Sequence, residues 1–591
     1  MRIINLKINN FRGIKHCDLN FAAQTVLVGD SNTGKSTILE AIDLVLGPER
    51  ASRRPVIDEH DFFAGKYFDD ENKSIDIWIE VIVADLDFEQ RAHFINHIEW
   101  WDTENLAIIE KPPPEATDAE TTIPVLRVGF RGYYDSEEDD FFGKTFFISP
   151  KLDDGTYEPF STGDKRKCGF LYLRTLRTGN RALSLERGSL LDIILKLHEL
   201  KPQMWEEVLS QLREISVASK PELGISEILT SVQNAVRKLV PIECADAPTI
   251  RVSQMTREHL RQILTVFMGT GINDDDGVEY IAPFHHQGTG TINTLVLSLL
   301  SMIAELKQNV IFAMEEPEIA IPPHTQKRII KSVIGKSAQA IFTSHSPYVL
   351  EEFEPAQILV VDRKTGELTG VPAHLPVKPK DFRDEVKRRF CEALLARRVL
   401  IVEGRTEYDT LSRLAEKLEA ESPERFASLG GLGIAVISAD TDNQIASLGE
   451  HFKKLGKSTY AIYDKQSCGD AQKISSSVDF PFESPENGFE RLVINHTSEQ
   501  ALRRYAAQVI CENKWPSHID KISNETATEQ LKERLMKYFK ANKAESSIAD
   551  CLCICTEAEL PQYIVDTLQA IRLSIISSEG TLDFADGGAY E

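Results

Sequence analysis

The chain has 591 residues, of which 42% are hydrophobic and 27% charged, and its formal net charge is −24. This length exceeds what one hydrophobic core usually supports, so we expect two to four domains. The acidic balance excludes a protein that coats nucleic acid indiscriminately, so any DNA site must be a local basic surface. We find no signal sequence and no apolar segment long enough to cross a bilayer, which predicts a cytoplasmic protein without a membrane partner.

A glycine-rich loop follows the buried-strand pattern of residues 25–28. The run Gly29-Asp30-Ser31-Asn32-Thr33-Gly34-Lys35-Ser36 matches the P-loop pattern G-x-x-x-x-G-K-[ST]. Gly29 and Gly34 allow backbone N–H groups to surround phosphate oxygens, while Lys35 brings a cation to the outer phosphates. The Ser36 hydroxyl can bind the Mg²⁺ of the nucleotide. We therefore predict ATP as a cofactor, with Asn32 and Thr37 completing the nucleotide-binding set.

Two regions with different hydrophobic periods follow the P-loop. Residues 74–85, 125–130 and 145–148 have period-two character, which predicts a β-rich lobe. Residues 189–240 have apolar residues three and four apart, which indicates a helical insertion.

A second strand with acidic residues at its end follows this insertion. Residues 310–314 are apolar and lead into Glu315 and Glu316, as in a Walker B strand. We interpret Glu315 as the acid on the metal side and Glu316 as the base that orients water. His345 follows another strand and is interpreted as a sensor of the γ-phosphate. For Glu315 and Glu316 the alternative is the start of a helix with acids at its N-terminus. For His345 the alternative is an ordinary loop histidine.

These motifs resemble those of ABC-type ATPases of the SMC/RecF-like class. The segment His286-Gln287-Gly288-Thr289-Gly290-Thr291-Ile292-Asn293 is similar to the signature that closes over a triphosphate held by another subunit. Gly288 and Gly290 would open a helix N-terminus, where free N–H groups face an anion. A plain turn is the alternative. The resemblance implies that hydrolysis needs two ATPase heads, hence a homodimer or a higher homo-oligomer.

Acidic residues follow two strands in the C-terminal third of the chain. Glu403 ends an apolar strand, Gly404 allows a tight turn, and Glu407 lies about one helical turn further on. Asp464 ends a later strand, and carboxylates of this kind can bind a divalent metal. An ordinary helix N-terminus with acids is the alternative.

The order of these strands and acids resembles the Toprim fold of topoisomerases, primases and OLD-family nucleases. Toprim domains usually end the later strand in Asp-x-Asp, and Gln466 stands where the second aspartate would be. Asp440, Asp442 and Glu490 therefore stay open as further metal ligands.

The ABC-type head and the C-terminal Toprim domain together resemble the OLD (overcoming lysogenisation defect) family over nearly the whole chain. The resemblance implies heads that dimerise and a nuclease that uses Mg²⁺, or Mn²⁺ or Ca²⁺ in its place, to cut DNA by a two-metal mechanism. It also implies a basic residue near the scissile phosphate, for which we choose Lys543, with a solvated helical lysine as the alternative. A role in anti-phage defence or DNA repair follows from the family alone, with a helicase or other defence protein as a further partner.

The expected fold class is α/β, with an ABC-type P-loop ATPase followed by an α/β Toprim domain. The expected domains are the N-terminal part of the ATPase with the β-rich lobe (1–188), a helical dimerisation insertion (189–242), the C-terminal part of the ATPase (243–378), a linker (379–396), and the Toprim nuclease with a helical extension (397–591).

Two groups of basic residues are candidate surfaces for DNA phosphates. The first group comprises Lys165, Arg166, Lys167, Arg174, Arg177, Arg181 and Arg187, and the second comprises Arg383, Lys387, Arg388, Arg389, Arg397 and Arg398. Ordinary solvated faces are the alternative.

The leading prediction is an ATP-regulated, divalent-metal-dependent DNA endonuclease or nickase. The alternative is a DNA-binding or repair ATPase whose Toprim module is catalytically weak, a reading that Gln466 supports. A topoisomerase or primase is disfavoured because the sequence has no evident strand-passage tyrosine context or zinc module.

Overall fold

The computed structural model divides into two compact units. The first unit comprises residues 1–24 and 36–344, and the second comprises residues 25–35 and 345–591. The structure describes residues 1–48, 56–109, 121–174, 183, 185, 189–198, 201–214, 225–239, 256–306, 310–319, 321–374, 384–439, 442–523, 525–542 and 546–579.

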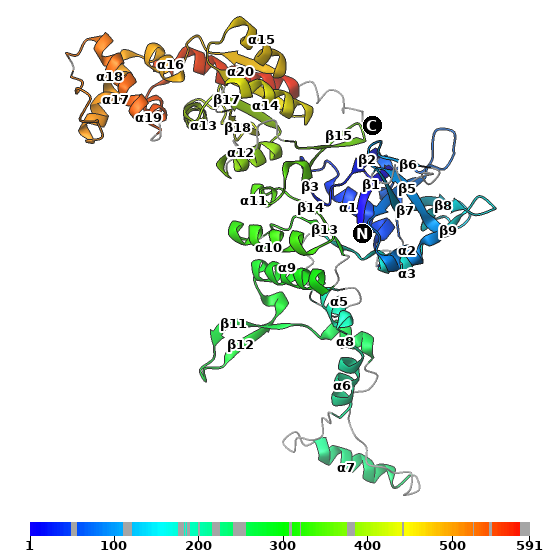
Figure 1. The fold of residues 1–591 in the computed structure, drawn as a ribbon. Coiled ribbons are helices and arrows are strands. Elements are labelled where there is room, and N and C mark those ends of the chain that lie inside the picture. Colours follow the sequence, from blue (N-terminus) through cyan, green and yellow to red (C-terminus); the bar gives the residue numbers. More distant parts are fainter. Residues whose placement is uncertain are drawn as a thin grey trace, which may run out of the picture. The chain divides into compact units, whose positions relative to one another are not determined.

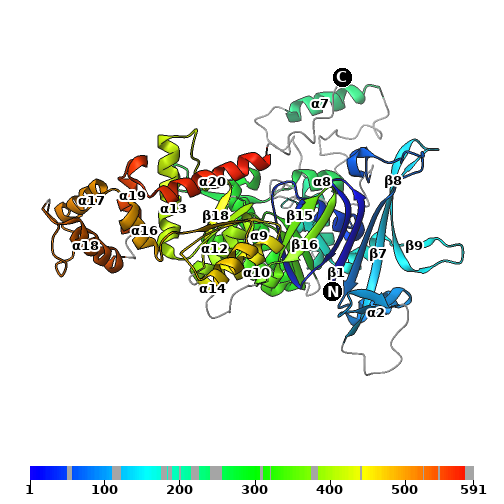
Figure 2. The ribbon, with the colours of Figure 1, turned by 90° about the horizontal axis from the view of Figure 1, so that it is seen from above.

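An antiparallel sheet forms the β-rich lobe of the first unit. Strand β1 (Arg2–Phe11) lies between β2 (Ile14–Asn20) and β4 (Ile77–Ala84), and β4 pairs with β7 (Thr122–Asp135). The long β7 then pairs with β8, as Figure 2 shows. The remaining strands of this lobe are β5 (Ile98–Asp102), β6 (Ala107–Ile109), β8 (Asp140–Lys151) and β9 (Tyr157–Pro159). Strands therefore form where the period-two pattern predicts them.

Three parallel strands carry the predicted Walker B acids in the same unit. Strand β13 (Ile311–Glu315) lies between β10 (Phe170–Leu173) and β14 (Gln339–Thr343). Every residue of β13 and β14 is buried, as expected of parallel strands covered on both faces. Helices α9 (Thr289–Leu306) and α10 (Pro323–Lys336) contact each other, and α10 also packs on β14.

Helices and a hairpin complete the first unit. Helix α5 contacts α9, whereas α7 has no buried residue among those described. The strands β11 and β12 pair only with each other in the described part of the chain. The elements are α1 (Lys35–Leu46), α2 (Phe88–His93), α3 (Thr162–Cys168), α5 (Leu190–Leu197), α6 (Lys201–Glu214), α7 (Ile225–Val236), α8 (Arg257–Ile263), β11 (Phe267–Asn273) and β12 (Glu279–Pro283).

The second unit begins with the strand that precedes the P-loop. Strand β3 (Gln24–Val28) pairs in parallel with β15 (Ile358–Lys364), which forms a hairpin with β16 (Glu367–Pro372). Helices α11 (Pro347–Leu350) and α12 (Asp384–Leu395) contact each other. The described part of the predicted linker 379–396 thus contains the helix α12.

A four-stranded parallel sheet forms the centre of the C-terminal region (Figure 1). Its order is β18-β17-β19-β20, and the three neighbouring pairs are all parallel. The carboxyl ends of all four strands therefore meet at one edge of the sheet. The strands are β17 (Arg398–Val402), β18 (Ile434–Ser438), β19 (Ser458–Tyr463) and β20 (Phe480–Glu483), and the helices between them are α13 (Arg405–Glu421), α14 (Asp442–Lys454) and α15 (Cys468–Ser477).

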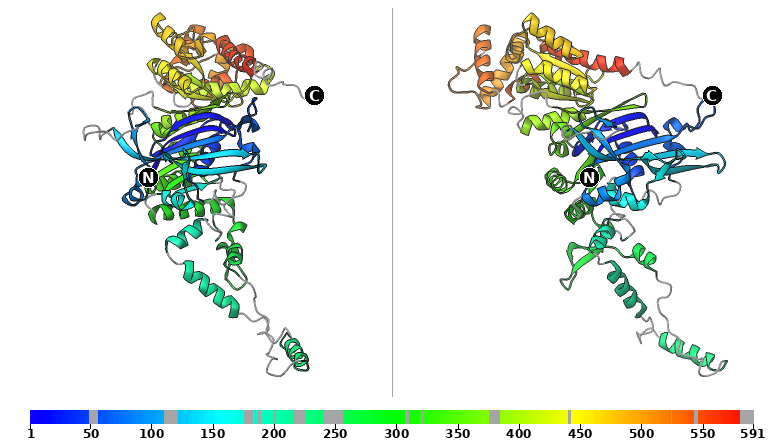
Figure 3. Two further views of the ribbon diagram at one scale, coloured as in Figure 1. Left: turned by 90° about the vertical axis from the view of Figure 1, so that its right-hand side faces the viewer. Right: turned by 45° about the vertical axis from the view of Figure 1, so that its right-hand side comes forward.

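Five further helices share one hydrophobic core with this sheet. The core joins Leu400 of β17 and Leu414 of α13 to Leu535 and Ile571 of the C-terminal helices. In both views of Figure 3 these helices, orange to red, stay grouped beside the sheet. They are α16 (Phe489–His496), α17 (Glu499–Cys511), α18 (Thr528–Ala541), α19 (Ser547–Cys553) and α20 (Gln562–Glu579). Among the described residues, none of the helices is both long and apolar enough to span a membrane.

Candidate functional site

The structure brings Glu403 and Asp464 together at the edge of the parallel sheet. Val402, the last residue of β17, is the register partner of Ile462 in β19, so the chain leaves both strands at nearly the same level. The backbone N–H of Asp464 donates a hydrogen bond to Oε2 of Glu403 at 3.2 Å. Both side chains are partly buried. Two acids that are 61 residues apart in sequence thus share one end of the sheet.

Glu407 lies in the first turn of α13 and is only 8% exposed. A Cβ atom placed on Gly404 would lie 3.0 Å from Oε2 of Glu407. The carboxylate therefore folds back toward the turn after β17. A side chain at position 404 would have to displace it.

The fourth strand adds a carboxylate that the sequence reasoning missed. Glu483 ends β20, and its Oε1 accepts a hydrogen bond from the backbone N–H of Gln466 at 3.0 Å. The sequence does show an acid at the end of this segment, but four residues are too short for the hydrophobic pattern to predict a strand. Of the alternative ligands, Glu490 lies in the first turn of α16 and Asp442 begins α14, whereas Asp440 lies outside the described residues.

A metal ion has the right kind of ligand here, although the set is incomplete in the described part of the chain. Carboxylate oxygens are the ligands that Mg²⁺ prefers in proteins, and Glu403, Glu407 and Asp464 are side chains of this kind. Within the described ranges, no three His, Cys, Asp or Glu side chains form a group that could hold a metal.

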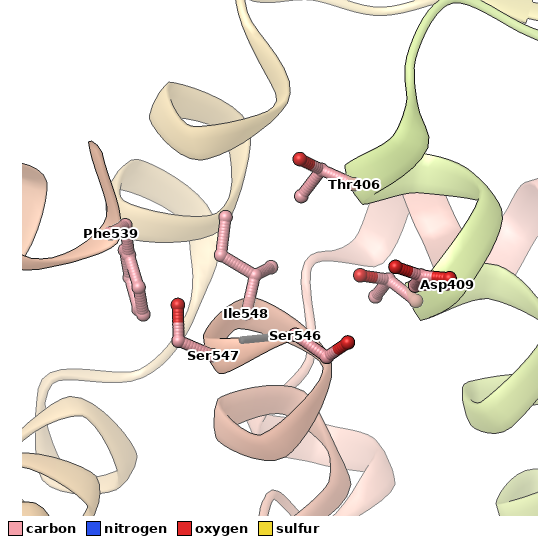
Figure 4. Close-up of a pocket in the computed structure, with 7 residues that line it drawn as sticks. Thr406, Asp409, Phe539, Ser546, Ser547 and Ile548 are labelled. Atoms are coloured by element: carbon pink, nitrogen blue, oxygen red, sulfur yellow. The ribbon is translucent and has the colours of Figure 1, made fainter. Parts of the chain in front are cut away.

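A small pocket lies beside the first turns of α13. Thr406 and Asp409 of α13 face Phe539, Ser546 and Ile548 from the C-terminal helices (Figure 4). Its volume of about 10 Å³ is near the minimum for one water molecule. The C-terminal helices therefore support α13 closely, and this pocket is too small for a nucleotide. Lys543, the predicted basic residue, lies outside the described residues.

The P-loop of the second unit requires glycine at its start. A Cβ atom on Gly29 would lie 2.4 Å from the carbonyl oxygen of Val361 in β15, which is a clash with backbone. Asn32 has a positive φ of 67° and is exposed. Nζ of Lys35 donates to the carbonyl oxygens of Gly29 at 2.9 Å and Asp30 at 2.7 Å. An ammonium group has three N–H donors, so a phosphate could add to these two carbonyl contacts or compete with them.

The predicted Walker B acids lie at the end of β13 in the first unit. Tyr172 of β10 donates its hydroxyl hydrogen to Oε1 of Glu315. Burial, followed by the nearby Glu315 charge, raises the pKa of Tyr172. The next residue, Glu316, has a φ of +45°, and its N–H donates to the carbonyl of Thr343 at 3.0 Å. A left-handed conformation at a glutamate costs about 1–3 kcal/mol, and such strain is typical of functional sites.

The other predicted nucleotide residues lie at helix starts or after a strand. Ser36 and Thr37 are in the first turn of α1. Gly288 precedes α9, and its carbonyl accepts from the N–H groups of Thr291 and Ile292; Gly290 lies in the first turn. His345 follows β14 and is exposed. Their roles stay predictions.

Several residues of the two basic groups already have partners within the protein. Lys165 is 2% exposed, its Nζ donates to the carbonyl of Leu44 at 3.0 Å, and burial lowers its pKa to about 8. It therefore cannot contact a DNA phosphate. Arg174 pairs with Glu40 at 2.9 Å. The side chains of Arg388 and Arg397 are also in ion pairs, whereas Arg177, Arg181, Arg187 and Arg383 lie outside the described residues.

The fold and these sites define a P-loop ATPase joined to a TOPRIM domain. The family described as "AAA ATPase domain" matches residues 1–122 and 184–350, and the family described as "Overcoming lysogenization defect protein-like, TOPRIM domain" matches residues 394–465. The chain therefore has an ATPase domain followed by an OLD-like (overcoming lysogenization defect-like) TOPRIM domain, which is the combination that its motifs predict.

Two relatives are similar over most of their length. The chain is 23% identical to the OLD nuclease of Thermus scotoductus over 452 residues, which cover 70% of this chain and 74% of that protein. It is 21% identical to Endonuclease GajA of Bacillus cereus over 565 residues, or 86% of each chain. This homology and the TOPRIM domain support a nuclease, and the two domains imply use of a nucleotide and a divalent metal.

Solved structures are similar to parts of the chain at low TM-scores. An SMC head bound to the C-winged helix domain of ScpA covers 63% of this chain and 98% of its own, with a TM-score of 0.34 and 14% identity. The match to the SMC head domain from Thermotoga maritima covers 64% of this chain and 100% of that chain, with a TM-score of 0.29 and 11% identity. The match to the C-terminal region of the Burkholderia pseudomallei OLD protein covers 30% of this chain and 98% of that chain, with a TM-score of 0.23 and 16% identity.

Proposed function

We propose that this protein is an ATP-regulated, divalent-metal-dependent endonuclease or nickase that cuts DNA. The observation that carries the proposal is the meeting of Glu403 and Asp464 at the carboxyl ends of two parallel strands, inside the segment matched by the OLD-like TOPRIM family. Acids at such an edge face solvent, where a phosphodiester can approach. The relatives named nuclease and endonuclease support the same class of reaction.

The residues of the site have separate roles in this proposal. A divalent ion, Mg²⁺ or Mn²⁺ or Ca²⁺, would be held by Glu403, Glu407 and Asp464, and when bound it supplies Lewis acidity at the phosphate; a second ion is the two-metal variant of the same chemistry. The turn at Gly404 keeps Glu407 beside the strand end. Asp440, Glu490 or Glu483 would complete the ligand set, and Lys543 would stabilise charge on the phosphate.

ATP is the proposed regulator of this cleavage. Lys35, Ser36 and Thr37 would bind the nucleotide, and Glu316 would orient the attacking water while Glu315 faces the magnesium. The hydrogen bond from Tyr172 holds the Glu315 carboxylate in a defined position. The positive φ at Glu316 is consistent with a side chain held in a special orientation.

The proposed assembly is a homodimer or a higher homo-oligomer formed through α7. Ile228, Val232 and Leu239 are 64%, 45% and 86% exposed, and they lie on the helix and just after it at spacings typical of one apolar stripe. A second copy of α7 would cover this stripe. A cytoplasmic location, a role in phage defence or repair, and a helicase or other defence partner belong to the same proposal through the family.

The alternative is a DNA-binding or repair ATPase with a catalytically weak TOPRIM module. Gln466 supports it, because its neutral side chain replaces an acid at the end of β19 and its N–H is bonded to Glu483. A neutral amide binds a divalent metal less strongly than a carboxylate.

Plasmid nicking separates the two functions. Purified protein is incubated with supercoiled plasmid and Mg²⁺ or Mn²⁺, beside Glu403→Ala and Lys35→Ala. We expect nicking that is lost in Glu403→Ala and survives in Lys35→Ala. Intact plasmid under every metal, together with measurable ATP turnover, would establish the alternative. Equal nicking by wild type and Glu403→Ala would place the active centre elsewhere.

A further inference from the structure

Helix α12 contacts the segment that follows the predicted γ-phosphate sensor. Nε of Arg388 donates to Oε1 of Glu351 at 2.9 Å, and its guanidinium lies 5.4 Å from the ring centre of Tyr348. Tyr348 is in α11 and Glu351 caps that helix, three to six residues after His345. The Glu351 side chain is only 9% exposed, whereas the Arg388 side chain is 47% exposed, so the ion pair is shielded from solvent on the side of the acid only.

The next residue of α12 contacts the carboxylate site. The guanidinium of Arg389 lies 3.9 Å from the ring centre of Tyr408, at a distance typical of close cation–π stacking. Tyr408 directly follows Glu407 in α13. Two adjacent arginines therefore join α11 to the helix that carries a predicted catalytic acid.

The end of α12 is fixed to the strands that carry the other two acids. Nζ of the buried Lys457 donates to the carbonyls of Leu394 and Ala396 at 2.8 and 2.7 Å. Lys457 directly precedes β19, which leads to Asp464. Arg397 directly precedes β17, which leads to Glu403.

Arg397 connects this end of α12 to the P-loop. Its Nε lies 2.8 Å from Oδ2 of Asp30. The carbonyl of the same Asp30 accepts from Lys35 Nζ and from the Thr33 hydroxyl. A P-loop lysine contacts nucleotide phosphates when a nucleotide is bound. A bound phosphate would therefore compete with the carbonyl of Asp30 for Lys35, and Asp30 is the residue whose side chain pairs with Arg397.

We propose that Arg397 and helix α12 couple occupancy of the P-loop to the geometry of Glu403, Glu407 and Asp464. The proposal rests on the proposed nuclease function and names the residues of its regulation. With Lys35 on the Asp30 carbonyl, the Asp30–Arg397 pair holds the start of β17 in one position. When Lys35 moves to a phosphate, Asp30 shifts, and the change reaches Glu403 through β17 and Glu407 through Arg389 and Tyr408. Arg388, Arg389 and Arg397 of the second basic group are therefore positioning residues rather than a free DNA surface.

Two readouts on the full-length chain test this coupling. The first is the ratio of plasmid nicking rates with and without a non-hydrolysable ATP analogue, a ratio in which a uniform DNA-binding defect cancels. The second is hydrogen–deuterium exchange of residues 398–412 with and without the analogue, which needs no cleavage. The variants are Arg397→Gln, Arg397→Lys and Arg388→Gln, with Lys473→Ala as the control because the side chain of Lys473 is 76% exposed and remote in sequence from α12. Binding of a fluorescent nucleotide confirms that each variant still takes up ATP.

The expected results differ between the variants. In wild type and Lys473→Ala the analogue should change the nicking rate by about 5- to 150-fold, the usual range of allosteric coupling, and alter exchange in residues 398–412. In Arg397→Gln the ratio should fall to within about twofold of unity and the exchange difference should disappear, and Arg388→Gln should reduce both. Arg397→Lys keeps the charge and should restore most of the effect.

Failure of the coupling and failure of the nuclease function give different results. Wild-type levels of both readouts in Arg397→Gln overturn the coupling. The coupling is also overturned if the analogue binds the wild-type protein but changes neither its nicking rate nor its hydrogen–deuterium exchange. In that case the nicking itself still supports the proposed nuclease function. If no protein nicks, but the exchange difference is present in wild type and lost in Arg397→Gln, the coupling holds and the nuclease proposal fails.

Discussion

Replacing Lys457 by methionine tests what a buried ammonium group contributes to the second unit. Lys457 is 8% exposed, and burial lowers its pKa from 10.5 to about 8, which corresponds to a loss of about 3 kcal/mol for the protonated form. Its hydrogen bonds to the Leu394 and Ala396 carbonyls offset this loss, at about 1.5–3 kcal/mol each. The Lys457→Met variant should therefore be less stable by about 0–3 kcal/mol near neutral pH.

The difference in the free energy of unfolding between wild type and Lys457→Met should grow with pH. Because the folded pKa lies below the unfolded one, the unfolded chain binds more protons between about pH 8 and pH 10.5, and wild-type stability rises over this window. From about pH 7 to about pH 9.5 the gain is about 2 kcal/mol. Methionine has no proton to lose, so the deficit of Lys457→Met should increase by this amount.

Urea denaturation at the two pH values, followed by tryptophan fluorescence, measures this change. Lys454→Met is the matched control, because Lys454 is exposed at the end of the neighbouring helix α14. Other titrating groups are the same in wild type and variant and cancel in the comparison. A deficit of Lys457→Met that stays constant between the two pH values would refute the burial argument.

Three further predictions address the two sites and the assembly. Gly29→Ala should weaken ATP binding by about tenfold or more, since its Cβ would meet the Val361 carbonyl, whereas Gly335→Ala, with open space around it, should bind normally in a fluorescent-nucleotide titration. Glu316→Gln should keep ATP binding but lower ATP turnover about 10²- to 10³-fold in a phosphate-release assay, and near-normal turnover would exclude Glu316 as the base. Changing Ile228 and Leu239 together to glutamate should convert the oligomer to monomer in sedimentation, because the charges would lie in an apolar contact, and an unchanged oligomer would exclude α7 as the interface.

The motifs with strict spacing were predictable from the sequence, because their meaning depends on local chain geometry. The P-loop needs a strand, a glycine turn and a helix start in succession, and the structure has β3, Gly29 and α1 in this order. Parallel strands place their carboxyl ends together, so acids after two such strands predict a shared edge even when many residues separate them. For this reason the combination of an ATPase with an OLD-like TOPRIM domain, the fold class and the proximity of Glu403 to Asp464 followed from residue order.

Only the tertiary structure decided the partners of the charged residues. Lys165 and Arg397 have no sequence pattern that separates them from solvated cations, yet one is buried under α1 and the other pairs with Asp30. Tyr172 likewise meets Glu315 from a strand 143 residues away in sequence. Hydrogen bonds and ion pairs of this kind depend on which strands become neighbours, and a local hydrophobic period contains no record of that choice. The sequence therefore predicted where the candidate sites lie, and the packing of distant strands determined the partners of their charged residues.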